Sequence, residues 1–314
     1  MLGYSFAMIE SFESCLSKAG VVHLNGGYAM GDEKTLDDYP ALFGTTNPTN
    51  DRRGLVQLDG AVKSGFLKKT HKLGLVLDDC PPSVRAYNRT VKPYIRRTGL
   101  TVAADAVLSC PDGASDASTL VQQLNNAVLE FRSKGVNRVF VEGIPFIFFA
   151  NTAQGQGWYP GYVLTSATGG AALDANPVPE DQLENIHGSG WIPYLDVSAS
   201  KQPPKTAPQQ RCLSLLKSVG IIPSLYNDFH AAYTTCDAMF LYEVALKATR
   251  GASSAGVVMR AIEALGSSYK GATSIDARTG FGTGDHDAVA VYRPWTWRKD
   301  CECFLYTGGP RPLP

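Results

Sequence analysis

The chain has 314 residues, of which 44% are hydrophobic and 18% are charged. These values predict a globular protein of about two domains and exclude bulk disorder. The 29 basic and 29 acidic residues cancel, and no basic stripe typical of nucleic-acid binding occurs. No run of about 18 apolar residues is found, so no membrane-spanning helix is predicted.

The N-terminal segment lacks the features of an export signal. Residues 1–20 have no basic start and no long apolar stretch, because Glu10 and Glu13 interrupt them. The segment is therefore not a signal peptide. We expect a helix end, a short strand VVHL and a glycine loop NGGY to follow, as far as Tyr28.

Four apolar segments between His71 and Gly170 predict β-strands that alternate with helices. The strand segments are HKLGLVLDD, LTVAADAVLS, VNRVFVEG and GYVLTSATGG. A run of this kind predicts a parallel sheet with right-handed crossovers and helices on both faces. Ligands of such sheets bind at the carboxyl ends of the strands. Those ends carry Asp78 and Asp79, Ser109, Glu142 and Gly143, and Ser166.

The helix between the second and third of these strands has the clearest pattern. Leu120, Leu124, Val128 and Phe131 fall on one face at helical spacing. Gly135 is placed to end the helix. The segment IPFIFFANTAQGQG, which begins at Ile144, predicts the next covering helix.

After Pro177 the sequence becomes polar and rich in proline. Its apolar island GWIPYLDV predicts a strand and a segment that crosses between two domains. Three helices follow, within 208–220, 228–251 and 253–266. The C-terminal tail, rich in glycine and aromatic residues, predicts a β-hairpin or two edge strands.

The cysteines indicate an oxidising compartment, although the N-terminus does not. None of them forms a C-x2-C pair, so zinc-ribbon and thioredoxin motifs have no support. Inert buried thiols are one interpretation, but disulfides explain so many cysteines better. The odd count leaves one cysteine free, or one whose partner is absent. The seven residues are Cys15, Cys80, Cys110, Cys212, Cys236, Cys301 and Cys303.

One disulfide is predicted from the order of the helices. Cys212 and Cys236 lie on consecutive helices with a short connection, and such helices pack antiparallel. A bond there would close a loop of about two dozen residues and contribute about 3 kcal/mol. Two buried thiols that face each other are the alternative.

No motif for catalysis, a metal or a cofactor is found. HGSGW and GASSAG are the segments most similar to a nucleophile elbow, but neither follows an obvious strand. GGYAMGDE is G-G-x-x-x-G rather than a dinucleotide fingerprint. The adjacent residues Asp285, His286 and Asp287 would point to opposite faces and chelate poorly, which favours a solvated turn. Asp78 and Asp79 suit either a ligand or a helix cap.

The order of elements resembles that of the type I periplasmic solute-binding proteins, specifically the branched-chain amino-acid (Leu/Ile/Val) receptors of ABC importers. CLSKAGVVHLNGGYAMGDE is similar to the family's helix and the strand whose end contacts the ligand. Residues 39–79 look like its crossover and the first strand of the second lobe. NNAVLEFRSKGVNRVFVEG looks like the next unit, and RCLSLLKSVG and YTTCDAMFLYEVALKATRG look like the helices that return to the first lobe.

The resemblance implies an α/β fold of two lobes, each a parallel sheet flanked by helices. It assigns 1–47 and 204–280 to lobe one, and 48–203 and 281–314 to lobe two. Family members begin with an export signal and a βαβ unit, so we expect lobe one to be truncated at the N-terminus. The full-length protein would then be periplasmic or on the cell surface.

The resemblance also implies a binding protein rather than an enzyme. It would hold an amino acid or another small polar organic molecule in the interlobe cleft by hinge closure, as a monomer that serves an ABC permease. The alternatives are a doubly wound nucleotide- or NAD-using enzyme, and a truncated fragment that binds nothing. Donors for a carboxylate and an acid for an ammonium group are the chemistry required, and loop or cap structure is the alternative for each candidate. The candidate contacts are Asn25, Gly27, Tyr28, Asp78, Asp79, Tyr87, Glu142, Ile144, Ser166 and Thr168.

Overall fold

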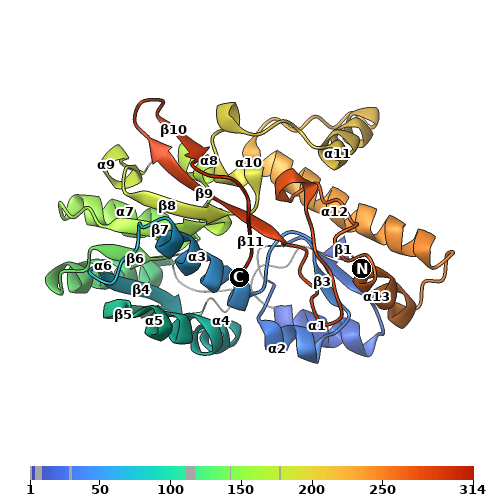
Figure 1. Ribbon diagram of the computed structural model, residues 1–314, viewed down its shortest axis with the longest axis horizontal. Coiled ribbons are helices and arrows are strands. Elements are labelled where there is room, and N and C mark those ends of the chain that lie inside the picture. The colour runs from blue at the N-terminus through green and yellow to red at the C-terminus, as the bar shows by residue number, and fades with distance from the viewer. Residues whose placement is uncertain (1, 4–8, 28–29, 111–116, 142, 177) are drawn as a thin grey trace.

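The fold contains two β-sheets, each with helices packed on it (Figure 1). The structure is a computed structural model. It describes residues 2–3, 9–27, 30–110, 117–141, 143–176 and 178–314.

The smaller sheet has three parallel strands in the order β1-β2-β3. The helices on its side of the molecule come from two distant parts of the chain (Figure 1). We call this part lobe one. Its elements are β1 Leu2–Gly3, β2 His23–Asn25, β3 Leu42–Gly44, α1 Ile9–Lys18, α2 Glu33–Asp38, α11 Ala207–Ser218, α12 Tyr226–Ala248 and α13 Ala255–Glu263.

The larger sheet has eight strands in the order β10-β9-β8-β7-β6-β4-β5, with β11 paired to β9. Strands β4 to β8 pair in parallel with one another, whereas the pairs β8–β9, β9–β10 and β9–β11 are antiparallel. We call this part lobe two. Its strands are β4 Lys72–Asp78, β5 Thr101–Leu108, β6 Arg138–Phe140, β7 Gly161–Thr165, β8 Ile186–Gly190, β9 Val291–Arg298, β10 Cys303–Tyr306 and β11 Arg311–Pro312.

Helices cover both faces of the larger sheet, as the sequence predicts. Val139 and Tyr162 pack with residues of α6 and α7, whereas Phe140 and Val163 pack with residues of α3 and α5. Neighbouring residues of a strand point to opposite faces, so both faces of β6 and β7 need apolar cover. The helices of this lobe are α3 Asn50–Lys63, α4 Pro81–Ala86, the π-helical turn η1 Tyr87–Val91, α5 Lys92–Thr98, α6 Ala117–Ser133, α7 Ile144–Gly155, α8 Gly170–Ala175 and α9 Glu180–Leu183.

The apolar face predicted for α6 is confirmed. Leu124, Val128 and Phe131 are fully buried in the core of lobe two. The helix ends near Gly135, whose φ of 69° suits glycine. The predicted C-terminal hairpin is also confirmed, because β9 and β10 pair antiparallel.

The chain passes between the lobes three times, through 45–49, 191–206 and 278–290. The second passage contains the short helix α10 Pro193–Asp196 and the 3₁₀ turn η3 Ala199–Lys201. A 3₁₀ turn η2 Ser166–Thr168 follows β7, and η4 Ile275–Ala277 precedes the third passage.

The strand predicted within GWIPYLDV is wrong, because this island contains α10. The strand lies earlier in the chain, at Ile186–Gly190. Its residues do not alternate between apolar and polar. A Cβ atom at Gly188 would lie 1.8 Å from Trp295, so glycine is required where that indole crosses the strand.

The predicted disulfide between Cys212 and Cys236 is present, with its Cα atoms 5.8 Å apart. Two further disulfides are found, Cys80–Cys110 and Cys301–Cys303. The seventh cysteine, Cys15, is an exposed free thiol. The odd count therefore leaves one unpaired residue, as the sequence predicts.

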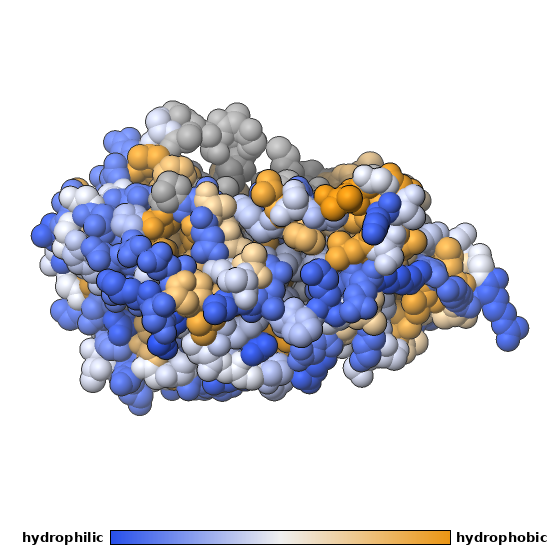
Figure 2. All heavy atoms as spheres, turned by 90° about the horizontal axis from the view of Figure 1, so that it is seen from above, coloured by the Kyte–Doolittle hydropathy of each residue, from blue (hydrophilic) through white to orange (hydrophobic). Residues whose placement is uncertain are grey.

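Apolar side chains are exposed where α11 turns into α12. Cys212 is buried, but Leu215 is 50% exposed and Val219 is 70% exposed. Figure 2 looks onto the molecule from above the view of Figure 1 and shows patches of apolar residues on both halves of this face. Among the described residues, no helix combines the length and apolar character that a membrane crossing requires.

We expect the double variant Cys212→Ala/Cys236→Ala to be less stable by about 3 kcal/mol, because the bond closes a long loop in the unfolded chain. Urea unfolding followed by circular dichroism would measure this loss. Cys15→Ala is the matched control and is expected to change the free energy of unfolding by less than about 0.5 kcal/mol. Equal stability of the double variant and the control would contradict the prediction.

Candidate functional site at the junction of the lobes

The carboxyl ends of three neighbouring strands of lobe two carry most of the predicted ligand residues. β6 lies between β4 and β7, so Asp78 and Asp79, Gly143, and Ser166 come to one edge of the sheet. Ile144 begins α7 at the same edge. Glu142 is outside the described residues.

Two predicted hydroxyl groups have partners within the protein. Ser166 Oγ accepts hydrogen bonds from the backbone N–H groups of Trp191, at 2.7 Å, and Ile192, at 3.2 Å. Thr168 Oγ1 accepts one from the N–H of Gly143, at 2.6 Å. Both side chains are buried. They join the loops after β6, β7 and β8, and thereby shape this edge.

The two predicted carboxylates lie beside the Cys80–Cys110 disulfide. Asp78 Oδ1 accepts from the N–H of Cys80 at 3.0 Å, and Asp79 Oδ1 accepts from the N–H of Cys110. Asp79 is the more exposed of the two. Tyr87 follows on η1, where burial raises the pKa of its phenol.

The lobe-one part of the site is the loop after β2. Asn25 Oδ1 accepts from the N–H of Gly27 at 2.7 Å, which closes a tight turn. The carbonyl oxygen of Gly27 accepts from Asn47 Nδ2 at 2.8 Å. Tyr28 lies outside the described residues.

Asn47 connects this loop to lobe two. Its Oδ1 accepts from the indole Nε1 of Trp191 at 3.1 Å, and both residues are buried. A chain of hydrogen bonds therefore runs from Gly27 through Asn47 and Trp191 to Ser166. Asn47 and Trp191 were not predicted as site residues, although both fall in segments that the sequence assigns to crossovers.

The first and third passages meet at Asp287. Its carboxylate accepts from the N–H of Thr49 at 3.0 Å and pairs with the guanidinium of Arg52. Gly44 bridges to the same segment. The prediction of a solvated turn is wrong for Asp287, which is buried.

Within the described ranges, no cluster of acidic, histidine or cysteine side chains is arranged to hold a metal ion.

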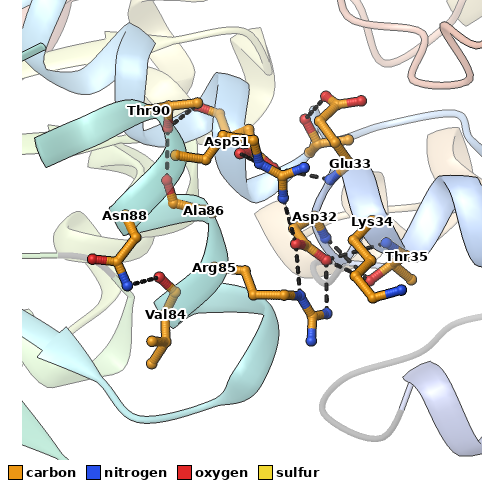
Figure 3. A network of polar contacts seen from close by, with 12 residues as sticks. Asp32, Glu33, Lys34, Thr35, Asp51, Val84, Arg85, Ala86, Asn88 and Thr90 are labelled. Carbon is orange, nitrogen blue, oxygen red and sulfur yellow. Dashed lines mark hydrogen bonds and ion pairs between the residues drawn. The ribbon is translucent and has the colours of Figure 1, made fainter. Parts of the chain in front are cut away.

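A cluster of charged residues also joins the lobes. Asp32 precedes α2 in lobe one and accepts two hydrogen bonds from Arg85 of α4, at 2.9 and 2.8 Å (Figure 3). Arg89 of η1 adds a contact of 2.6 Å and also pairs with Asp51 at 3.0 Å. We call Asp32, Arg85 and Arg89 the interlobe clasp.

The clasp keeps the Asp32 carboxylate ionised. Burial by itself would raise the pKa of Asp32, but hydrogen bonds from Arg85 and Thr35 outweigh it and lower the pKa to about 2. The carboxylate also accepts from the N–H of Thr35 at the start of α2, as a helix cap. One side chain thus both begins a lobe-one helix and binds lobe two.

Comparison with solved structures finds the same architecture in transport proteins. A branched-chain amino acid ABC transporter protein from Thermus thermophilus with bound valine superposes with a TM-score of 0.69 at 15% identity, over 99% of this chain and 77% of the other. The chain has the two-lobed fold of these substrate-binding proteins. The predicted fold class is thereby confirmed.

Two other structures extend this likeness to different ligands. A solute-binding protein from R. palustris in complex with 4-hydroxybenzoate gives a TM-score of 0.71 at 13% identity, over 100% and 78% of the two chains. A fatty acid ABC transporter substrate-binding protein from Thermomonospora curvata superposes with a TM-score of 0.70 at 12% identity. The superposition covers 99% of this chain and 74% of the other. No family model and no curated protein matches the sequence.

Asp32→Asn tests the clasp, because asparagine keeps the helix cap and removes the charge. We expect a loss of about 2 kcal/mol of unfolding free energy at pH 7, measured by urea unfolding. The native pKa is lowered, so the carboxylate stabilises the fold above its unfolded pKa of about 4. The difference from wild type should therefore shrink as the pH falls from about 5 toward 2.

Asp38→Asn is the matched control, because Asp38 pairs with exposed Lys34 on the same helix. Its effect should stay below about 0.5 kcal/mol. A loss for Asp32→Asn that is no larger than this control, or that does not vary with pH, would contradict the assignment.

Proposed function

We propose that the protein is the solute-binding component of an ABC importer. The observation that carries the proposal is the junction itself, where the carboxyl ends of strands from two α/β lobes meet beside three chain passages. Ligands of open α/β sheets bind at such ends. Passages of this kind serve as hinges when lobes close around a ligand.

The proposed ligand is an amino acid or another small organic acid. The similar structures carry valine and 4-hydroxybenzoate, and a third is named for fatty acids. All three ligands contain a carboxylate next to an apolar body. We propose the loop after β2 and the ends of β4, β6 and β7 as the contact regions. The residues proposed are Asn25, Gly27, Tyr28, Asp78, Asp79, Tyr87, Glu142, Ile144, Ser166 and Thr168.

The proposal includes a cellular setting and a division of the chain. We propose an extracytoplasmic protein that acts as a monomer and delivers its solute to a membrane permease. We propose 1–47 with 204–280 as lobe one and 48–203 with 281–314 as lobe two. The disulfides support an oxidising compartment.

A nucleotide-using enzyme is less well supported. In such an enzyme the glycine loop after β2 would present free N–H groups of the next helix to a phosphate. Here the N–H groups of Glu33 and Thr35 already donate to Asp51 and Asp32. These two N–H groups are therefore already used within the protein and are not available to a phosphate.

Thermal unfolding in the presence of valine, leucine, 4-hydroxybenzoate and a short fatty acid would test the proposal. At 100 times its Kd, a true ligand should raise the unfolding free energy by about 2.7 kcal/mol. The corresponding carboxamides are the control and should bind more weakly. Stabilisation by ATP or NAD, with none by any organic acid, would contradict the proposed function.

Asn47→Ala should weaken binding of the ligand found in this screen, with a Kd raised about 10-fold or more. The reason is that Asn47 holds the lobe-one loop against Trp191. Loss of these two buried hydrogen bonds is worth about 1–3 kcal/mol. Isothermal titration calorimetry on the folded variant would measure the change. Asn125→Ala, on the exposed side of α6, is the control. Wild-type affinity in Asn47→Ala would show that this connection does not organise the site.

A further inference from the structure

The hairpin disulfide Cys301–Cys303 is more accessible to solvent than the disulfide Cys212–Cys236. Cys301 is exposed at the tip of the β9–β10 hairpin, which lies at an edge of the larger sheet (Figure 1). Its partner Cys303 is only 4% exposed and begins β10. Cys212 of α11 and Cys236 of α12 are both buried. An external thiol can therefore reach one sulfur of the hairpin disulfide directly.

The hairpin disulfide also stabilises the fold least. It joins residues only two positions apart in sequence, whereas the other two disulfides join residues 24 and 30 positions apart. A bond that closes so short a loop restricts the unfolded chain very little. The residue between the two cysteines, Glu302, has a φ of 47°, in the left-handed region that costs a non-glycine residue free energy.

We propose that Cys301–Cys303 is a thiol-exchange site that accepts two electrons from a dithiol. A thiolate of the dithiol attacks the exposed Sγ of Cys301, and the disulfide breaks. Cys303 leaves as a thiolate and takes a proton from water. The second thiol of the reductant then displaces Cys301, which yields two cysteine thiols and a cyclic disulfide. Reduction allows Glu302 to leave its left-handed conformation.

Reduction would also alter a neighbouring surface. Glu302 lines a cavity of about 230 Å³ together with Trp297, Leu183 and Asp174. Lys299, at the same turn, pairs with Glu184 at 3.0 Å. Movement of the hairpin tip therefore changes the rim of this cavity. The inference does not depend on the proposed transport function.

Graded reduction of the folded full-length chain would test the site. The Cys15→Ala protein would be treated with increasing dithiothreitol, blocked with N-ethylmaleimide and mapped by peptide mass spectrometry. Cys301 and Cys303 should be labelled at a reductant concentration at least about 10-fold below that needed for Cys212 and Cys236. Simultaneous labelling, or labelling of Cys212 and Cys236 first, would overturn the proposal.

Single variants test which sulfur is attacked. In the Cys15→Ala background, Cys303→Ser leaves the exposed Cys301, and Cys301→Ser leaves the buried Cys303. The first variant should react with an aromatic disulfide reagent at least about 10-fold faster than the second, because exposure governs access to the thiolate. Equal rates in folded protein, or a faster reaction at Cys303, would overturn attack at Cys301.

Discussion

The buried carboxylate of Asp287 is the constraint on which the arrangement of the lobes depends. A buried charge requires partners, and this one has the Arg52 guanidinium and the N–H of Thr49. Those partners stand at the start of α3, where the first passage enters lobe two, while Asp287 lies on the third passage. The interaction therefore fixes where β9 enters the larger sheet and places Gly44 beside the same segment.

Two other contacts between the lobes differ in their physical character. Asn47 and Trp191 form neutral buried hydrogen bonds close to the passages. Arg85 and Arg89 form charged hydrogen bonds to Asp32 between α4 and the start of α2. When the lobes separate at α2 and α4, water can hydrate the Asp32 carboxylate and the two guanidinium groups. This hydration offsets part of the free energy lost when the clasp opens. Asn47 and Trp191 are both buried, so loss of their contacts would leave buried polar groups without partners.

The sequence predicts the elements of this fold well where the periodicity is strong. The alternating strands and helices of lobe two, the face of α6 and the Cys212–Cys236 bond all follow from spacing. Strand β8 does not, because Gly188 leaves room for Trp295, which lies more than one hundred residues later. Asn47 and Trp191 depend on the meeting of two distant passages, which no local pattern encodes. Asp78, Asp79, Ile144 and Ser166 come to one edge of the larger sheet, but the direct role of the predicted contact residues with a ligand stays a prediction.

We propose that one solute binds between the two lobes. The most direct test is a crystal structure with the organic acid that stabilises the protein most strongly. Our account predicts electron density for the ligand between the loop after β2 and the ends of β4, β6 and β7, with contacts to both lobes. Density confined to one lobe, or located in the surface cavity between Phe240, Val244 and Leu265, would contradict it.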